Sequence, residues 1–282
     1  MQTILACIDA SKYAMPVCDI AAWASSKCEL PLELLHVVQR KDAVAERHDL
    51  SGAIGLGAKT QLLEELTQID EAQARLQVER GRALLAAGEE RLRQAGTAEV
   101  KILHRHGGIV ETILEREGQA CVVVIGKRGA SHQFAQDHIG SKIERVVRAS
   151  IKPILIAPLE VEPPRTAVLA YDGSQAAQRA LERCANSPLL HDLSVHLVIA
   201  GAADEKHCRL ADDVRAQIKG REVLVTHKAG NAPDVIASAV AKTPGAILVM
   251  GAYGHSEFRT LLIGSTTTAT IRLVEVPILL VR

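Results

Sequence analysis

The sequence predicts an α/β protein: two tandem domains, each a five-stranded parallel sheet that is doubly wound, with helices on both faces. Three observations predict it. Short aliphatic runs alternate with helical patterns, the same series of motifs occurs twice, and aromatic residues make up only 2% of a chain that is 48% hydrophobic. Continuous aliphatic strands are typical of parallel sheets buried on both faces. Strand–helix alternation implies right-handed crossovers, and 282 residues are enough for two such domains.

Ten segments carry the strand pattern. In the first half they are 3–8, 32–38, 99–103, 120–126 and 153–157, and in the second half 166–171, 193–199, 221–226, 246–251 and 277–281. Helical patterns fill the intervals between them. Ligands of this Rossmann-like architecture bind at the carboxyl ends of the strands, where the strand order reverses.

An internal repeat fixes the order of these segments. A strand followed by Asp-x-Ser occurs at Asp9 and again at Asp172. Further along, a strand that ends in glycine is followed by a Gly-Ser pair and then by a final strand led by proline, also in both halves. We therefore expect a duplicated domain, with one copy at 1–158 and the other at 164–282. The proline-rich stretch 158–164 between them stops both helices and central strands.

The first half carries an extra segment, mainly within 39–97. Asp9 and Gly126 lie 117 positions apart, whereas Asp172 and Gly251 lie 79 apart. The pattern from 59 to 94 is helical, with leucines among charged residues, although glycines at 81 and 88 weaken a helix. Two interpretations are open: a long helix packed on the surface, or a protruding arm that recruits a partner or a second copy of the chain.

The second half contains a glycine loop suited to an anion. Gly251-x2-Gly254-x9-Gly264-Ser265-Thr266 follows a buried strand and opens a helix. Glycines let backbone amides approach a ligand closely, and the start of a helix favours negative charge. The hydroxyls of Ser265 and Thr266 can donate to phosphate oxygens. Asp172, at the end of the first strand of this half, can accept hydrogen bonds from an adenine amino group or a ribose hydroxyl.

These motifs resemble the universal stress protein family over nearly the whole chain, as a tandem pair. The matching segments are 171–174, 251–256 and 262–266 in the second half, and 9–11, 34–37 and 140–147 in the first. The resemblance implies binding of ATP, or of ADP or AMP, with Mg²⁺ accompanying a triphosphate. It also implies that the two closing strands pair antiparallel and make an internal pseudo-dimer.

Carried over by position, the resemblance assigns nine residues of the second half to the nucleotide. Asp172 meets the adenine or ribose, and Val198 lines the base pocket. Met250, Gly251 and Gly254 contact the nucleotide, and Tyr253 lies beside it. The Gly-Ser-Thr segment at 264–266 holds the phosphates. In chain order the assigned residues are Asp172, Val198, Met250, Gly251, Tyr253, Gly254, Gly264, Ser265 and Thr266.

The first half departs from this pattern. Ten residues rather than nine separate Gly129 from Gly140, and Asp137 places a negative charge near the expected phosphates, which Lys127 and Arg128 could offset. We therefore expect the second half to be the main binding site. Whether the first half also binds a nucleotide stays open, as does the alternative that both glycine loops only shape a turn. The residues concerned in the first half are Asp9, Gly126, Gly129, Gly140 and Ser141.

Other signals are weak. The stretch 52–60 lacks the lysine spacing of a phosphate-binding P-loop, because Ala58 intervenes. His104 and His106 lack further ligands at zinc spacing and are expected in an exposed loop; contact with a ligand at the pocket of the first half is the alternative. His36 is expected in the core or a pocket wall. We predict no metal site in the protein itself and find no catalytic residue, so ATP hydrolysis would be slow at most.

Charge and composition argue against several classes of partner and location. Lys and Arg number 33, as do Asp and Glu, which argues against nucleic acid as a partner. No apolar run is long enough for a membrane span. The start of the chain lacks a cationic leader, and the six cysteines form no C-x-x-C pair, so we expect a reduced, cytoplasmic protein.

Three functions fit these observations. The first is a stress-response protein that binds adenine nucleotide chiefly in its second domain and acts as a regulatory or sensing module. The second is a nucleotide-independent interaction or scaffold protein that uses the tandem fold and the 59–94 helix. The third, an enzyme acting on a nucleotide-like ligand, requires catalytic groups that the sequence does not reveal.

Overall fold

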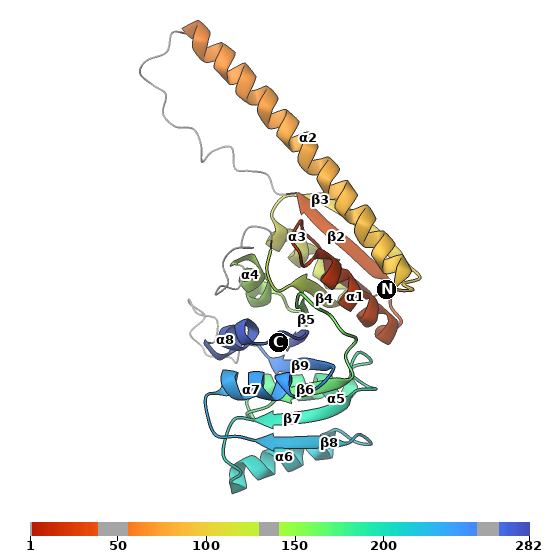
Figure 1. Ribbon diagram of the computed structural model, residues 1–282, viewed down its shortest axis with the longest axis vertical. Helices are drawn as coiled ribbons and strands as arrows, with labels where there is room; N and C mark the ends of the chain where they lie inside the picture. The colour runs from red at the N-terminus through yellow and green to blue at the C-terminus, as the bar shows by residue number, and fades with distance from the viewer. Residues whose placement is uncertain (1, 39–55, 130–140, 253–264) are drawn as a thin grey trace.

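The structure is a computed structural model, and it describes residues 2–38, 56–129, 141–252 and 265–282. These residues form a ten-stranded sheet in the order β3-β2-β1-β4-β5-β10-β9-β6-β7-β8 (Figure 1). All ten predicted strands are present, and the predicted α/β class is confirmed. The strands are β1 Thr3–Cys7, β2 Leu32–Val38, β3 Val100–His106, β4 Ala120–Gly126, β5 Ile154–Ala157, β6 Thr166–Ala170, β7 Ser194–Ile199, β8 Val223–His227, β9 Ala246–Gly251 and β10 Ile278–Val281.

The two halves of the sheet join edge to edge at their closing strands. Within each half all strands pair in parallel, but β5 and β10 pair antiparallel, with Leu279 opposite Leu155. The predicted internal pseudo-dimer is therefore confirmed. Because the four residues of each closing strand are all buried, burial of apolar surface stabilises this junction in addition to its ladder of hydrogen bonds.

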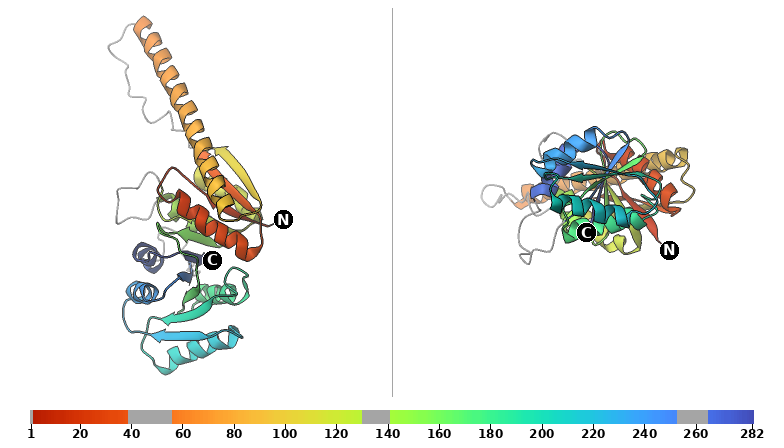
Figure 2. Two further views of the ribbon diagram at one scale, coloured as in Figure 1. Left: turned by 45° about the vertical axis from the view of Figure 1, so that its right-hand side comes forward. Right: turned by 90° about the horizontal axis from the view of Figure 1, so that it is seen from below.

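Helices cover both faces of the sheet, as the doubly wound prediction requires (Figure 2). One buried cluster holds residues of α1, α2, α5 and α6 against one face, and a second holds residues of α3, α4, α7 and α8 against the other. The helices are α1 Ala14–Cys28, α2 Leu56–Gln94, α3 Ile109–Arg116, α4 Ser141–Ala149, α5 Gln175–Asn186, α6 Glu205–Gln217, α7 Ala232–Ala241 and α8 Ser265–Leu273, with a short 3₁₀ turn, η1, at Glu117–Gln119.

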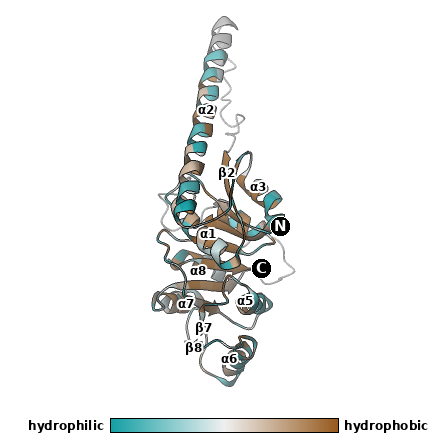
Figure 3. Cartoon of the chain, turned by 90° about the vertical axis from the view of Figure 1, so that its right-hand side faces the viewer, coloured by the Kyte–Doolittle hydropathy of each residue, from teal (hydrophilic) through white to brown (hydrophobic). Residues whose placement is uncertain are grey.

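Helix α2 is both packed and protruding. Its C-terminal part buries Leu85 and Leu92 against the sheet, whereas its N-terminal part extends beyond the rest of the molecule (Figures 1 and 3). On that extension Leu66, Ile69 and Leu76 are about half exposed, at 46%, 51% and 48%. The helical prediction for 59–94 therefore holds, and the two interpretations of this segment describe different parts of the same helix.

The glycines of α2 have a packing role that the sequence did not reveal. A Cβ atom on Gly81 would lie 2.5 Å from Nε2 of His104, and one on Gly88 would lie 2.9 Å from Cδ2 of Leu34. Both glycines therefore lie where α2 closely approaches side chains of β2 and β3. Glycine lowers the helix propensity at these two positions, but because it has no side chain it lets α2 lie closer to the sheet.

The hydropathy of α2 alternates along its length (Figure 3). Although α2 has 39 residues, charged side chains interrupt its apolar positions, and neither it nor any other helix in the described ranges has the apolar length that a membrane crossing needs.

Candidate functional site

Four of the predicted site residues lie at the same edge of the second half-sheet. Strands β9, β6 and β7 are neighbours and run parallel, with Ala170 opposite Val198 and Leu169 opposite Val249. Their carboxyl ends therefore coincide. Asp172 follows β6 by two residues, Val198 is near the end of β7, and Met250 and Gly251 end β9. The structure thus brings Asp172, Val198, Met250 and Gly251 to the edge where ligands of parallel α/β sheets bind.

Asp172 is exposed at this edge and is held there by a tight turn. Its Oδ1 atom accepts a hydrogen bond from the Ser174 backbone N–H at 2.9 Å. Gly173 adopts a left-handed φ of 77°, which favours glycine. Ser174 then caps α5, its Oγ accepting from the Ala177 N–H at 3.2 Å. A carboxylate fixed in this way can accept further hydrogen bonds from a ligand without losing much side-chain freedom.

Two side chains that were not among the predicted site residues fix this turn. Tyr171 is buried, and its hydroxyl donates to Oε1 of Gln178 at 2.8 Å. Leu210 of α6 packs over Gly173, where an added Cβ would lie 2.9 Å from Leu210 Cδ2. Tyr171 could have been found from the sequence, because it directly precedes Asp172. Leu210 comes from a distant segment, and no local pattern pointed to it.

Val198 and Met250 provide an apolar floor beneath the edge. Their exposed fractions are 1% and 5%, and both belong to the cluster covered by α7 and α8. The predicted lining of a base pocket therefore corresponds to packed apolar side chains in this structure.

Gly251 has a clear packing reason to be glycine. A Cβ atom there would lie 2.3 Å from the backbone C and O atoms of Ala176, in the first turn of α5. At the equivalent Gly126, an added Cβ atom would lie 2.6 Å from the Cβ atom of Tyr13. The next amide, that of Ala252, donates to the Val281 carbonyl at 2.7 Å. At this end of β9 the missing side chain thus allows the strand to contact α5.

The amino end of α8 lies beyond β9 and is the predicted phosphate position. The helix begins at Ser265, and Thr266 is exposed in its first turn. The first amides of a helix have no partners within it, and the helix dipole makes this end positive. Tyr253, Gly254 and Gly264 lie outside the described residues, as does the side chain of Ser265.

The first half repeats the aspartate turn. Oδ1 of Asp9 accepts from the Ser11 N–H at 3.1 Å, as Asp172 does from Ser174. Gly129 approaches the same carboxylate, since a Cβ there would lie 3.0 Å from Asp9 Oδ2. Ser141 begins α4, and Gly140 lies outside the described residues. The repeat that the sequence predicted is therefore present in the geometry of the turns.

The expected role of Lys127 is wrong. We expected its charge to offset Asp137 near phosphates of the first half, but the side chain is 3% exposed and points into the second half. Its Nζ donates to the carbonyls of Arg272 and Val274 and lies 2.7 Å from a carboxylate oxygen of Glu275. Burial lowers the pKa of Lys127, and Glu275 opposes that effect. Asp137 lies outside the described residues.

Two histidines, His104 and His106, are also placed differently from the expectation. His104 is part of β3 rather than of a loop, and its ring lies 5.6 Å from that of His36 and 5.8 Å from that of His106. His36 Nδ1 donates a hydrogen bond to the Ile8 carbonyl oxygen at 2.9 Å. Across the described ranges, no three His, Cys, Asp or Glu side chains are grouped so that they could hold a metal ion.

Comparisons with known proteins agree with this architecture. A model of the universal stress protein family matches residues 1–158 and 198–282. Universal stress protein Slr1230 of Synechocystis sp. is 33% identical over an alignment of 287 residues that covers both chains in full.

Solved structures share the fold over the same length. A universal stress protein from Archaeoglobus fulgidus matches with a TM-score of 0.70 and 21% identity, over 99% of this chain and 98% of its own. A protein described as a putative universal stress protein from Pseudomonas aeruginosa matches with a TM-score of 0.57 and 14% identity, over 100% of this chain and 93% of its own. On the extent of the family match and the full-length relative, the chain belongs to the universal stress protein family.

Proposed function

We propose that this protein binds an adenine nucleotide at the carboxyl ends of β6 and β9 and acts as a regulatory or sensing module in a stress response. The observation that carries the proposal is the meeting of Asp172, Val198, Met250 and Gly251 at one edge of the sheet. Helix α8, the next element after β9 in the chain, would supply its amino end to this edge. An exposed carboxylate, an apolar floor and a positive helix end are the three features that a nucleotide needs from such an edge.

The chemistry of these groups assigns them to different parts of the ligand. Asp172 would accept hydrogen bonds from the adenine amino group or a ribose hydroxyl. The first amides of α8, with the hydroxyls of Ser265 and Thr266, would hold phosphate oxygens, and Gly254 and Gly264 would let the loop approach them. Tyr253 would lie beside the nucleotide, and Mg²⁺ would accompany a triphosphate by binding its oxygens.

We further propose domain boundaries at 1–158 and 164–282, with the second domain as the main binding site. Residues 158–165 carry neither helix nor strand, which supports a linker there. The exposed carboxylate of Asp172 and the standard spacing of the second glycine loop favour the second domain. We place the protein in the cytoplasm, where its six cysteines, all free thiols in the described part of the chain, would stay reduced.

Titration calorimetry with ATP, ADP and AMP tests this function. We expect the wild-type chain to bind and the Gly254→Val variant to lose most of the heat, because a side chain would block the approach of the loop to phosphate. Gly129→Val, at the equivalent position of the first half, is the matched control and should keep the heat. Equal heats from the wild type and Gly254→Val would contradict the proposal, and loss of heat only in Gly129→Val would move the site to the first half.

A second function, assembly through α2 with another copy of the chain, rests on the exposed Leu66, Ile69 and Leu76. Their spacing places them along one face of the protruding part of the helix. Replacing all three with serine tests it better than deleting 40–97, because a deletion would also remove Leu85 and Leu92 from the core. Light scattering should report a lower mass for the triple variant if α2 mediates assembly, and an unchanged mass would exclude this role.

A further inference from the structure

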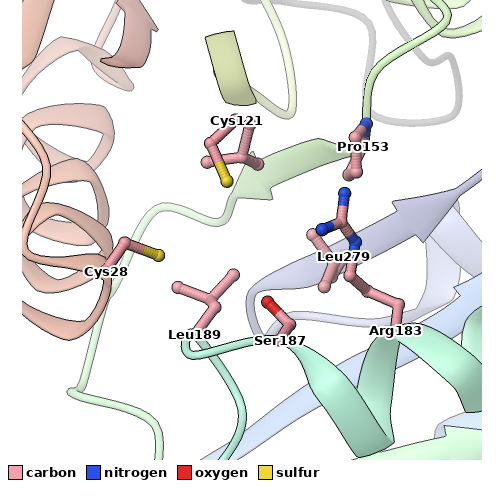
Figure 4. A pocket seen from close by; sticks show the side chains of 8 residues that line it. Cys28, Cys121, Pro153, Arg183, Ser187, Leu189 and Leu279 are labelled. Atoms are coloured by element: carbon pink, nitrogen blue, oxygen red, sulfur yellow. The ribbon is translucent and has the colours of Figure 1, made fainter. Parts of the chain in front are cut away.

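Two cysteines that are far apart in the sequence face each other in the structure. Cys28 is the last residue of α1, and Cys121 is the second residue of β4. Both are partly exposed free thiols, and both line the same pocket. Figure 4 shows both sulfur atoms turned into a common pocket.

The pocket lies at the junction of the two halves. Cys28, Cys121, Val122 and Pro153 of the first half line one part of it, and Arg183, Ser187, Leu189 and Leu279 of the second half line the rest. Arg183 extends from α5 toward the thiols (Figure 4). The positive charges of Arg183 and Lys152 both act on Cys121. This is the partly exposed, electropositive surrounding in which cysteines react.

The other cysteines lack this surrounding. Cys7, Cys18 and Cys184 are buried, and burial raises the pKa of each. Cys208 is exposed, so it is accessible to reagents and serves as an internal reference for an ordinary surface thiol.

We propose that Cys28 and Cys121 form a redox site whose substrate is a small peroxide and whose product is an intramolecular disulfide. Cys121 is the reacting nucleophile and Cys28 the resolving thiol. The site is separate from the proposed nucleotide site, and neither proposal depends on the other.

The reaction proceeds in two balanced steps. The Cys121 thiolate attacks one oxygen of hydrogen peroxide, the O–O bond breaks, and the released hydroxide takes up a proton to become water, which leaves Cys121 as a sulfenic acid. The Cys28 sulfur then attacks the sulfenic sulfur, the S–O bond breaks, and the Cys28 proton and the leaving hydroxide form a second water. Two thiols have been oxidised by two electrons, and one peroxide has been reduced to two waters. A dithiol reductant reverses the change by thiol–disulfide exchange.

The surroundings of Cys121 explain why it would react first. Arg183 of the second half extends toward the pair (Figure 4). Interaction with the Cys28 thiol lowers the pKa of Cys121; burial opposes this, and the charges of Arg183 and Lys152 add to the lowering. The same interaction, together with burial, raises the pKa of Cys28. The thiolate is the form that attacks peroxide.

Oxidation would also change the electrostatic interactions between the two halves at the junction. Forming the disulfide removes the negative charge beside Arg183, a residue of the second half. The neighbouring Lys27 forms an ion pair with Asp192 of the second half at 3.0 Å. The redox state of Cys28 and Cys121 would therefore change the charge that the first half presents to Arg183 of the second half.

Peptide mapping of the full-length protein after treatment with hydrogen peroxide tests the proposal. We expect a Cys28–Cys121 cross-linked peptide that disappears on reduction with dithiothreitol. It should form on the order of tenfold faster than oxidation of Cys208, because a larger fraction of Cys121 is thiolate. Oxidation of Cys208 first, or disulfides only between chains, would overturn the proposal.

Two variants assign the roles of the sulfurs. In Cys28→Ser, Cys121 should stop at the sulfenic acid, which dimedone traps; in Cys121→Ser, no dimedone adduct should appear at Cys28. Arg183→Gln should slow formation of the cross-link, whereas Arg179→Gln on the same helix serves as the matched control. Dimedone trapping at Cys28 in Cys121→Ser, or an unchanged rate in Arg183→Gln, would contradict the assigned roles.

Discussion

The Nζ atom of Lys127 lies 2.8 Å from the carbonyl oxygen of Val274, the residue that directly follows α8. An analogous contact occurs on the other side of the junction, where an Nη1 atom of Arg282 lies 2.8 Å from the carbonyl oxygen of Ser150, the residue after α4. Each half therefore supplies a cation to the carboxyl end of a helix in the other half. Such a cation satisfies carbonyls that lack partners within the helix and complements the helix dipole.

Replacing Lys127 with methionine should weaken the junction. The substitution keeps the apolar stem but removes the Lys127 donor from the carbonyls of Arg272 and Val274, of which the contact with Val274 is buried, at a cost of about 1–3 kcal/mol in the free energy of unfolding. Urea denaturation measures the loss. Lys12→Met, at an exposed lysine, is the control and should change stability little. Equal stability of the two variants would show that the Lys127 contacts contribute nothing.

Gly251→Ala should destabilise the second half. The added Cβ would lie 2.3 Å from the backbone of Ala176, so α5 must shift, and overpacking of this kind costs about 1–3 kcal/mol or more. Thermal unfolding followed by circular dichroism measures the effect. Gly118→Ala is the matched control, because nothing lies within 4 Å of its Cβ position. A Gly251→Ala variant as stable as the wild type would refute the packing role.

Gly81→Leu should release α2 from the sheet. The new side chain would occupy the space of the His104 and His36 rings, which an added Cβ alone would approach to 2.5 and 2.8 Å. Limited trypsin digestion should then cut faster at Arg80 and Arg82. Ala86→Leu, at an exposed position of the same helix, should not change the rate. If both variants are digested as slowly as the wild type, close contact at Gly81 does not hold α2 in place.

Stability should fall in mild acid because of His196. This buried side chain lies within hydrogen-bond distance of Thr226 Oγ1 at 2.9 Å and of Thr243 Oγ1 at 3.0 Å, and burial lowers its pKa. Below roughly 6.5, the pKa of an unperturbed histidine, the unfolded chain binds a proton that the folded chain does not. The free energy of unfolding should therefore decrease as the pH falls, by up to about 1.4 kcal/mol per pH unit, and level off below the folded-state pKa.

Urea denaturation at several pH values compares the wild type with His196→Gln, which keeps polar atoms near both threonines. The variant should show a smaller loss of stability in acid. Parallel pH dependences of the two proteins would mean that His196 does not contribute to it.

The strands were predictable because local composition decides them. Runs such as 122–125 are aliphatic throughout, and a strand buried on both faces needs that composition. β3 continues to His106, beyond its predicted end at 103. His104 interrupts the apolar pattern, but it packs beneath α2 at Gly81, a contact that depends on tertiary structure.

The internal repeat was enough to predict at which edge of the sheet the candidate site lies. The order of the motifs was enough to bring Asp172 and Gly251 to one edge, because parallel strands share the direction of their carboxyl ends. Lys127 was misjudged because its partners, Arg272 and Val274, lie in the other half of the chain. The Cys28 and Cys121 pair was missed for the same reason: no spacing rule for cysteines connects residues on a helix end and a distant strand.

The structure of the protein crystallised with ATP and Mg²⁺ tests the central claim most directly. The account predicts adenine or ribose within hydrogen-bond distance of the Asp172 carboxylate and phosphate oxygens at the first amides of α8. A crystal grown in saturating nucleotide in which chain atoms fill that edge, or in which the nucleotide binds elsewhere, would contradict it.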